Sequence, residues 1–342
     1  MDRQSYGDAL KNPKPYAFVP FAPRVRAVDV LGHDKLDLAN QYSGRLLYTF
    51  KVLTPVFVGG GSYALGADVG FPQERVVNPF YRVDGIPTIP GSSFKGVVRS
   101  IVETVSPSCL TVTRVSPNLL PGNVTLAQTH RSQCGPTHAC LACSMFGRMG
   151  QLGKVRFSDV QPKEKAQTQL FRLAALYTPR AFRVPRGYLD KDREKGGRFK
   201  GRKFYYHSRP AEDPRQPPVE VLRVGQLLHG QVDFENLTAA EMGLLFFATG
   251  VDGTLVLKLG GGKPMGLGSL QVVQAELRLL EGNHYTEADT QERIYREQDL
   301  LNFIRKAVDA AAAQRLFLFE QAQALANILK YPPERSAPQG MY

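Results

Sequence analysis

The sequence predicts one α+β domain built on a ferredoxin-like core. Three observations lead to this class. The expected elements follow one another as strand, helix, strand, strand, helix, strand, which is the ferredoxin-like order. The first expected helix carries apolar residues at the helical period, whereas the expected strands are rich in β-branched and aromatic residues. Neither a tandem repeat nor a linker divides the 342 residues.

The first half of the core contains a strand, a hairpin and a helix. GRLLYTFKVLTPVFVG (44–59) alternates as a strand does, and a glycine cluster ends it. ERVVNPFYRVDGIPTIP (74–90) is predicted to be a hairpin turned at Asp84-Gly85, a dipeptide favoured in two-residue turns. GSSFKGVVRSIVETVS (91–106) is predicted to be a helix because serines able to cap it precede apolar residues at helical spacing.

The second half supplies the remaining core elements. Strands are predicted at 153–162 and 225–237, a buried helix at 238–250, and two strands around a glycine-rich loop at 254–280. Residues 285–330 are charged, then rich in Ala and Leu, and are predicted to be helical.

These elements divide the chain into three parts. Residues 1–44 are expected to be a loosely structured, proline-rich leader, 45–282 the ferredoxin-like domain, and 283–342 a helical C-terminal tail. Two insertions interrupt the domain, a cysteine-rich one at 107–150 and a basic one at 163–220.

The charge of the chain is concentrated in one segment. The formal net charge is +12, and residues 179–209 carry eleven Lys or Arg against three Asp or Glu, which amounts to +8. Aromatic residues interleave these cations, a composition that neutralises phosphates and stacks on bases, so Arg202, Lys203 and Tyr205 are candidate RNA or DNA contacts. A solvated basic loop is the alternative. No run of about eighteen apolar residues and no signal peptide are visible, so a cytoplasmic protein without a membrane partner is expected.

Two further segments are suited to phosphate binding. The start of the expected helix combines free backbone N–H groups with hydroxyls and cations, from Ser92, Ser93, Lys95 and Arg99. In GGGKPMGLGSL (260–270), glycines remove side chains that would block a phosphate and a lysine adds a cation, which makes Gly260, Gly261, Gly262, Lys263 and Gly266 candidates. A capped amphipathic helix and a glycine-rich hairpin turn are the alternatives.

Four potential metal ligands lie within ten residues. Cys134, His138, Cys140 and Cys143 form C-x3-H-x-C-x2-C, which can hold one tetrahedral structural zinc ion. Nothing suggests secretion, so metal binding is favoured over a disulfide framework. Cys109 offers a fifth candidate ligand, and His130 could substitute for His138.

Four motifs in order carry a family resemblance. LTPVFVGGG (53–61), IPTIPGSSFKGVVRS (86–100), CLACSMFG (140–147) and GGGKPMGLGSL (260–270) resemble the successive motifs of the RAMP superfamily of type III CRISPR effector complexes. The chain most resembles the backbone subunits of those complexes. The resemblance implies an RRM-related fold, a glycine-rich loop against guide RNA, partners that include target RNA and other subunits, and often a zinc-stabilised element.

The resemblance also implies a candidate catalytic residue. Related subunits cut target RNA with an aspartate in the loop after the first strand, in a metal-dependent reaction where a 2′-hydroxyl attacks the adjacent phosphate. Asp68 is the corresponding residue, with Mg²⁺ or Mn²⁺ as cofactor, although Glu74 and Asp84 stay open because the loop is longer than the usual pattern. The alternative is a non-catalytic RNA-binding or capping subunit of the same assembly. A standalone endoribonuclease would require a histidine such as His207 or His229.

Overall fold

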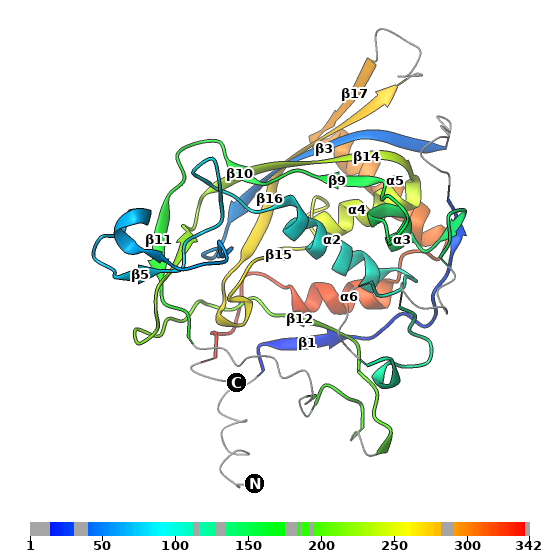
Figure 1. Cartoon of the computed structure of the whole chain (residues 1–342). Coiled ribbons are helices and arrows are strands. Elements are labelled where there is room, and N and C mark those ends of the chain that lie inside the picture. The colour runs from blue at the N-terminus through cyan, green and yellow to red at the C-terminus, as the bar shows by residue number, and fades with distance from the viewer. Residues whose placement is uncertain are drawn as a thin grey trace.

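A long antiparallel sheet forms the frame of the molecule, and helices pack beneath its concave side (Figure 1). The computed structural model describes residues 14–30, 40–111, 116–126, 134–174, 184, 187–191, 195–281 and 291–338. Among these residues, no helix has the length and apolar character that a membrane span requires.

The central strand of the sheet is β3 (Gln41–Val52). It pairs antiparallel with β14 (Leu227–Thr238) on one side and with β16 (Ser269–Glu281) on the other. Next to β14 lie β9 (Val155–Phe157) and β10 (Gln161–Pro162), and next to β16 lie β15 (Leu257–Lys258) and β17 (Gln291–Arg296).

Two crossover helices connect the core strands. α2 (Gly91–Val105) leads from β3 toward β9, and α4 (Ala239–Thr249) leads from β14 to β16. The core strands therefore lie in the order β9, β14, β3, β16, the fourth core strand beside the first, which is consistent with the predicted ferredoxin-like arrangement.

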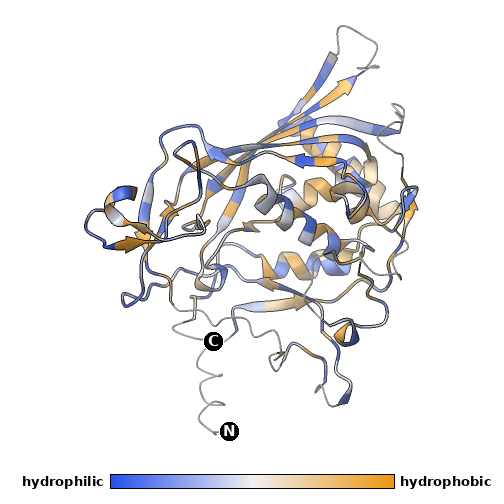
Figure 2. Ribbon diagram, viewed as in Figure 1, coloured by the Kyte–Doolittle hydropathy of each residue, from blue (hydrophilic) through white to orange (hydrophobic). Residues whose placement is uncertain are grey.

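Burial of apolar surface holds the helices to the sheet. The core joins β3 to α2 through packed aromatic rings of Tyr48, Phe50 and Phe94, whose centroids lie 5.0–5.3 Å apart. α4 is buried along almost its whole length, and Figure 2 shows it as one of the most hydrophobic elements. A hydrophobic helix enclosed on all sides gains most of its stability from this packing.

The remaining helices and strands surround this sheet. They are β1 (Tyr16–Val19), β2 (Val28–Asp29), β4 (Ala64–Leu65), β5 (Val76–Val77), β6 (Arg82–Val83), β7 (Ile86–Pro87), β8 (His138–Ala139), α3 (Leu141–Phe146), β11 (Thr168–Phe171), β12 (Arg202–Tyr205), β13 (Val219–Leu222), α5 (Glu297–Ala313) and α6 (Phe319–Ile328). Short 3-10 turns within the described residues are η1 (Gly66–Val69), η2 (Pro117–Leu119) and η4 (Lys263–Met265).

The two chain ends differ from the expected leader and tail. The described part of the leader contributes β1, which pairs with β12, and the first residues of β3. Residues 291–296 form a strand paired with β16 rather than a helix. α5 packs on α4 so closely that a Cβ on Gly243 would lie 2.4 Å from the Ala307 carbonyl oxygen, so this helix belongs to the core.

Predictions that depend on nearby residues agree more closely with the structure than the predictions for the chain ends. The hairpin turns at Asp84 and Gly85, both with positive φ (50° and 77°), as a two-residue turn of this kind requires. The first strand is shorter than expected, because residues after Val52 leave the sheet. The helix at 91–105 forms, but Pro90 occupies its N-cap and the Asp159 carboxylate, not a serine, accepts the Gly91 N–H at 2.7 Å.

Candidate metal centre and nucleic-acid interface

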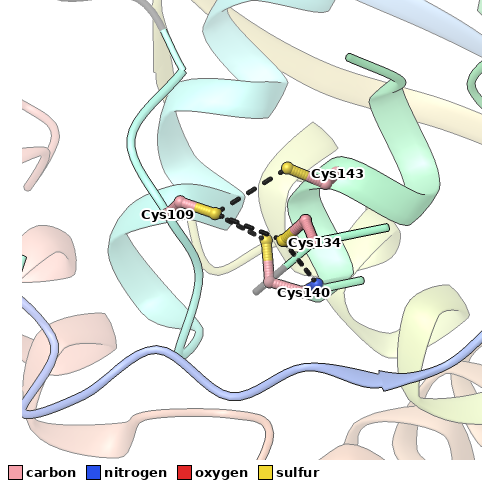
Figure 3. Close-up of side chains that lie close together, drawn as sticks. All are labelled: Cys109, Cys134, Cys140 and Cys143. Carbon is pink, nitrogen blue, oxygen red and sulfur yellow. Dashed lines mark hydrogen bonds between the residues drawn. The ribbon is translucent and has the colours of Figure 1, made fainter. Parts of the chain in front are cut away.

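Four cysteine side chains converge beside α2 (Figure 3). Cys109 follows the end of α2 and faces the other three, which come from residue 134 and from the start of α3. The Cys109 sulfur lies 3.5 Å from that of Cys134, 3.4 Å from that of Cys140 and 3.8 Å from that of Cys143. All four sulfurs lie within 4.8 Å of one another, and all four residues are buried.

This geometry fits a tetrahedral metal ion. Zinc–sulfur bonds of about 2.3 Å place the sulfurs of a Cys₄ site about 3.8 Å apart, close to the spacings found here. The Cys140 backbone N–H also donates to the Cys134 sulfur at 3.2 Å, a contact that stabilises a thiolate. Hydrogen bonding from Cys109 lowers the pKa of Cys134, whereas the pKa of Cys109 is raised by the same contact. The cluster is therefore a candidate metal centre.

The structure brings Cys109, rather than His138, to the other three ligands. His138 is exposed, and both ring nitrogens are engaged, Nε2 with the Asp29 carboxylate at 2.7 Å and Nδ1 with the Thr137 hydroxyl at 2.9 Å. The prediction of His138 as a ligand is wrong because β8 pairs with β2, and this pairing directs His138 toward Asp29. His130 lies outside the described residues.

The glycine-rich loop lies between β15 and β16, and its glycines are required by the protein's own backbone. A Cβ on Gly260 would lie 2.3 Å from the Phe57 carbonyl oxygen, and one on Gly266 would lie 2.8 Å from the Ser208 carbonyl oxygen. Both residues have positive φ, near 90°. The sequence predicts glycines that admit a phosphate, whereas the structure gives these two an internal packing role.

The same loop uses most of its backbone donors internally. Gly261 N–H donates to the Phe57 carbonyl at 2.8 Å, and Gly268 N–H donates to the Pro55 carbonyl at 2.9 Å. The N–H groups of residues 265, 266 and 267 donate to carbonyls at 262 and 263. An anion at this loop would therefore depend mainly on side-chain cations.

The two predicted arginines share one buried carboxylate, so their cluster keeps only one net positive charge. Arg99 Nε lies 2.8 Å from one oxygen of the buried Glu103 carboxylate, and Arg202 pairs with the other oxygen. Burial raises the pKa of Glu103, but Arg202, Thr111 and Arg99 outweigh this effect and hold the pKa below its ordinary value. Arg99 and Arg202 therefore connect α2 to β12 rather than forming a free phosphate-binding pair.

The predicted lysines have no such carboxylate partner in the described structure. The Lys203 ammonium lies among the rings of Tyr16, Tyr188 and Tyr205, 4.7–5.3 Å from their centroids, and donates to the hydroxyls of the last two. Burial lowers the pKa of Lys203, but these hydrogen bonds outweigh it and the net pKa is raised. Burial and the nearby charge of Lys203 lower the pKa of Lys263.

One buried lysine was missed by the sequence analysis. Lys258 is 6% exposed, and its Nζ has no hydrogen-bond partner in the described structure. Burial, with a smaller contribution from Lys263, lowers its pKa to about 7. The available signal was a lysine between two leucines, two residues before the glycine-rich loop.

The start of α2 is open to solvent. Ser92 and Ser93 are exposed, and Lys95 is half-buried, with a pKa lowered by burial and by Arg99. The Gly91 N–H, the first of the helix, already donates to the Asp159 carboxylate. The predicted anion site at this helix start therefore has fewer backbone N–H donors to offer than the sequence suggested.

Asp68 lies in η1 and is exposed. Its carboxylate makes no hydrogen bond or ion pair with any described residue. The two competing carboxylates differ, because Glu74 pairs with Arg172 and Asp84 forms the hairpin turn. Glu74 is therefore held in an ion pair, whereas the carboxylates of Asp68 and Asp84 make no hydrogen bond or ion pair with a described residue.

The two histidines considered for catalysis are structural. The Nδ1 of His207 accepts from the Ser269 hydroxyl at 2.7 Å, and its Nε2 donates to the Val256 carbonyl at 3.0 Å. Burial lowers the pKa of His207 to about 3, so the ring is neutral. His229 contacts the Thr49 hydroxyl on the sheet at 3.0 Å.

The fold defines an α+β protein with an antiparallel sheet, two crossover helices and a glycine-rich loop before the fourth core strand. The model of the RAMP superfamily matches residues 49–271, and the chain therefore belongs to the RAMP superfamily. The comparison with curated proteins finds no match.

A solved structure with some likeness is described as the cryo-EM structure of the Type III-B Cmr-beta bound to cognate target RNA. The identity is 14% and the TM-score is 0.38, with 69% of this chain covered. The match spans 61% of the length of that other chain.

Proposed function

We propose that the chain is a guide-RNA-binding backbone subunit of a type III CRISPR interference complex and positions target RNA there. Membership of the RAMP superfamily carries the proposal. Lys263 in the glycine-rich loop supports it, because a lysine without a carboxylate partner among the described residues is suited to an RNA phosphate. Its partners would be guide RNA, target RNA and other subunits of the complex.

The test is to co-express the chain with its genomic neighbours, purify the assembly and sequence the bound RNA. Repeat-derived RNA of defined length is expected. A purified assembly that carries no such RNA, or a chain that does not join an assembly, would contradict the proposal. The chain alone should bind single-stranded RNA with an affinity that falls as salt rises, since phosphate contacts release counterions.

We further propose Asp68 as the residue that supports target-RNA cleavage. A single exposed carboxylate is compatible with Mg²⁺ or Mn²⁺, because such ions bind through one or two carboxylates together with substrate phosphates. The ion would neutralise charge developing on the phosphate. Asp68 would orient the RNA so that the 2′-oxygen forms a bond to phosphorus while the bond to the 5′-oxygen breaks.

Asp68→Ala should retain target binding and lose cleavage, by roughly a hundredfold or more in rate. Assembled complexes are mixed with end-labelled complementary RNA and Mg²⁺ or Mn²⁺, and both fragments and binding are measured. Asp84→Asn, which removes the competing carboxylate but keeps a residue that tolerates the positive φ of the turn, is measured beside it and should cleave as wild type does. Equal cleavage by wild type and Asp68→Ala would exclude this role, and a wild-type complex that binds without cutting would favour a non-catalytic RNA-binding or capping subunit.

The metal at the cysteine cluster is proposed to be structural zinc, because four buried sulfurs leave no open coordination position. Freshly purified protein should contain one zinc ion per chain. Cys109→Ser should lose most of this metal, whereas His138→Ala should keep it. The reverse result would restore the histidine as a ligand, and metal-free wild type would exclude the site.

A further inference from the structure

A cavity of about 660 Å³ opens at the turn that joins α5 to α6. Three segments far apart in the sequence line it, namely residues 23–26 after β1, Pro107 after α2, and residues between 313 and 318 at the turn. Small-molecule sites in proteins are concave and typically enclose roughly 300–1,000 Å³. The lining residues belong neither to the glycine-rich loop nor to the loop that carries Asp68, so this cavity is separate from the proposed RNA and cleavage sites.

The lining of the cavity is cationic. Arg24, Arg26 and Arg315 contribute three guanidinium groups, and no lining residue is acidic. None of the three arginines forms an ion pair with a carboxylate in the part of the chain that the structure describes. Guanidinium groups repel one another, and each presents several N–H donors in a fixed fork. An anion in the cavity would relieve this repulsion and accept the donors.

Hydrogen bonds hold two sides of the cavity together before any ligand binds. The Arg26 backbone N–H donates to the Pro107 carbonyl at 2.8 Å, and the Arg26 Nη1 donates to the Gln314 carbonyl at 2.7 Å. The second contact satisfies one carbonyl at the C-terminal end of α5 and uses only one of the guanidinium donors. The remaining donors of Arg26 are available to a ligand, and their position is already fixed.

Arg315 occupies a backbone position that favours glycine. Its φ is 55°, in the left-handed region, and it follows Gln314, the C-cap of α5. The Leu316 N–H donates to the Ala311 carbonyl at 2.9 Å and the Arg315 N–H to the Ala312 carbonyl at 2.8 Å, a pattern typical of helix ends that carry glycine at this position. Residues strained in this way cluster at functional sites. Here the strained residue places a guanidinium group at the cavity.

The other lining residues narrow the class of anion. Pro23, Pro107 and Leu318 form an apolar wall beside the arginines. Three positive charges match a chain of phosphates better than one carboxylate side chain, and guanidinium forks bind phosphate oxygens in pairs. The apolar wall adds a surface against which a base can lie. A nucleoside triphosphate supplies both parts, whereas an acidic peptide lacks the clustered charge and the flat organic group.

We propose that this cavity binds a nucleoside triphosphate, with its phosphates on Arg24, Arg26 and Arg315 and its base against the apolar wall. Such a site is independent of the RNA-binding role proposed above.

The experiment is isothermal titration calorimetry of the full chain at constant ionic strength. The probes are ATP and its two halves, adenosine and tripolyphosphate. ATP should bind with a Kd below about 1 mM. Tripolyphosphate should bind more weakly because it has no base to place against the apolar wall, and adenosine should show no measurable binding because it has no phosphate.

Two arginine variants test the contacts. Arg315→Gly removes a guanidinium group and suits the positive φ, so affinity for ATP should fall by roughly tenfold or more while the midpoint of urea unfolding is kept or raised. Arg24→Met should weaken ATP binding to a similar extent, because it removes a charge-assisted contact. The matched control is Arg215→Met, which deletes an exposed arginine paired with Asp213 outside the cavity and should bind ATP as wild type does.

The control is needed because the formal net charge of +12 attracts ATP weakly to the whole surface. Equal losses of affinity in Arg215→Met and Arg315→Gly would overturn the proposal, and so would unchanged affinity in both cavity variants. Wild type that shows no saturable ATP binding would overturn it as well. Adenosine that binds as tightly as ATP would contradict the role of the arginines, and tripolyphosphate that binds as tightly as ATP would contradict the nucleoside.

Other anions provide the remaining outcomes. Single-stranded RNA or a glutamate-rich peptide whose binding is lost in Arg315→Gly, together with no ATP binding by wild type, would overturn the proposal and assign the cavity to that polymer. The proposed function is judged separately, from RNA recovered with the assembled complex, so each of the two can fail without the other.

Discussion

Two lysines in the same core have opposite surroundings. Lys154 is 4% exposed and Lys258 is 6% exposed, so burial does not distinguish them. The Lys154 ammonium donates to the Glu241 carboxylate at 3.2 Å and to the Asn236 carbonyl at 2.9 Å, whereas that of Lys258 has no partner in the described structure. The partner, rather than the depth of burial, therefore distinguishes the two lysines.

The Lys154 site is complete because several elements meet at one carboxylate. Glu241 forms a capping box with Thr238 at the start of α4 and also accepts from the Ser144 hydroxyl of α3 at 2.5 Å. A fully satisfied polar cluster of this kind specifies how its elements pack. The Glu103 cluster has the same character, since it joins α2 to β12.

The largest effect is expected from breaking the complete site. Lys154→Met leaves the Glu241 carboxylate buried without its cation and should lower the free energy of unfolding by about 3–5 kcal/mol. Urea unfolding of the full chain measures this loss. Adding Glu241→Gln to Lys154→Met should recover part of it, and no recovery would mean that packing, rather than charge, dominates at this site.

A smaller loss is expected at Glu103, because its two arginines are partly exposed. Glu103→Gln should lower the free energy of unfolding by about 2–3 kcal/mol near neutral pH. The folded-state pKa of Glu103 is lowered, so its contribution is present above the unfolded pKa and is lost as pH falls through the folded pKa.

Acid unfolding of wild type and Glu103→Gln tests the sign of this effect. The two stability curves should differ most near neutral pH and approach each other in acid. Parallel curves would show that the carboxylate charge is not what stabilises the cluster.

The smallest effect, with the opposite sign, is expected at the incomplete site. Lys258→Met removes an unpaired amine and should leave stability unchanged or raise it by about 1–2 kcal/mol at about pH 7. The folded-state pKa of about 7 lies below the ordinary lysine value of 10.5, so the unfolded chain binds more protons between these values. Wild-type stability should therefore gain relative to Lys258→Met as pH rises through this range.

Comparing wild type with this variant cancels the titration of all other groups. A destabilised Lys258→Met would show that Lys258 has a structural partner in solution, and the contrast with Lys154 would disappear.

The sequence predicted the fold best where structure is local. The helix at 91–105 and the turn at Asp84 and Gly85 follow from spacing and turn chemistry within a few residues. The pairing of β1 with β12 depends on contacts between segments far apart in the sequence, and β17 pairs with β16, its neighbour along the chain, although its charged sequence was assigned to a helix. Local patterns carry little information about such partners, so the strands at 16–19 and 291–296 were not predicted, whereas the helices predicted after them form as α5 and α6.

The candidate sites were likewise predicted where their residues lie close together in the sequence, and were missed where the residues lie far apart. Three of the four clustered cysteines lie within ten residues and were predicted, but Cys109 precedes Cys134 by 25 positions and spacing could not rank it above His138. The arginines Arg99 and Arg202 looked free because Glu103 meets Arg202 only in the folded chain. Lys258 was missed because a lysine within a strand ordinarily faces solvent.

The position of β3 in the chain determines when, during synthesis, the centre of the sheet can form. This strand is complete by residue 52, yet its partners are β14 and β16, which end at residues 238 and 281. Long loops must close before the sheet centre forms, which makes folding slow and keeps it incomplete until most of the chain has left the ribosome. Leu46 and Phe50, fully buried in the native sheet, are exposed to aggregation during that interval. Slower translation and more chaperone should therefore raise the yield of folded protein more than changes to the surface would.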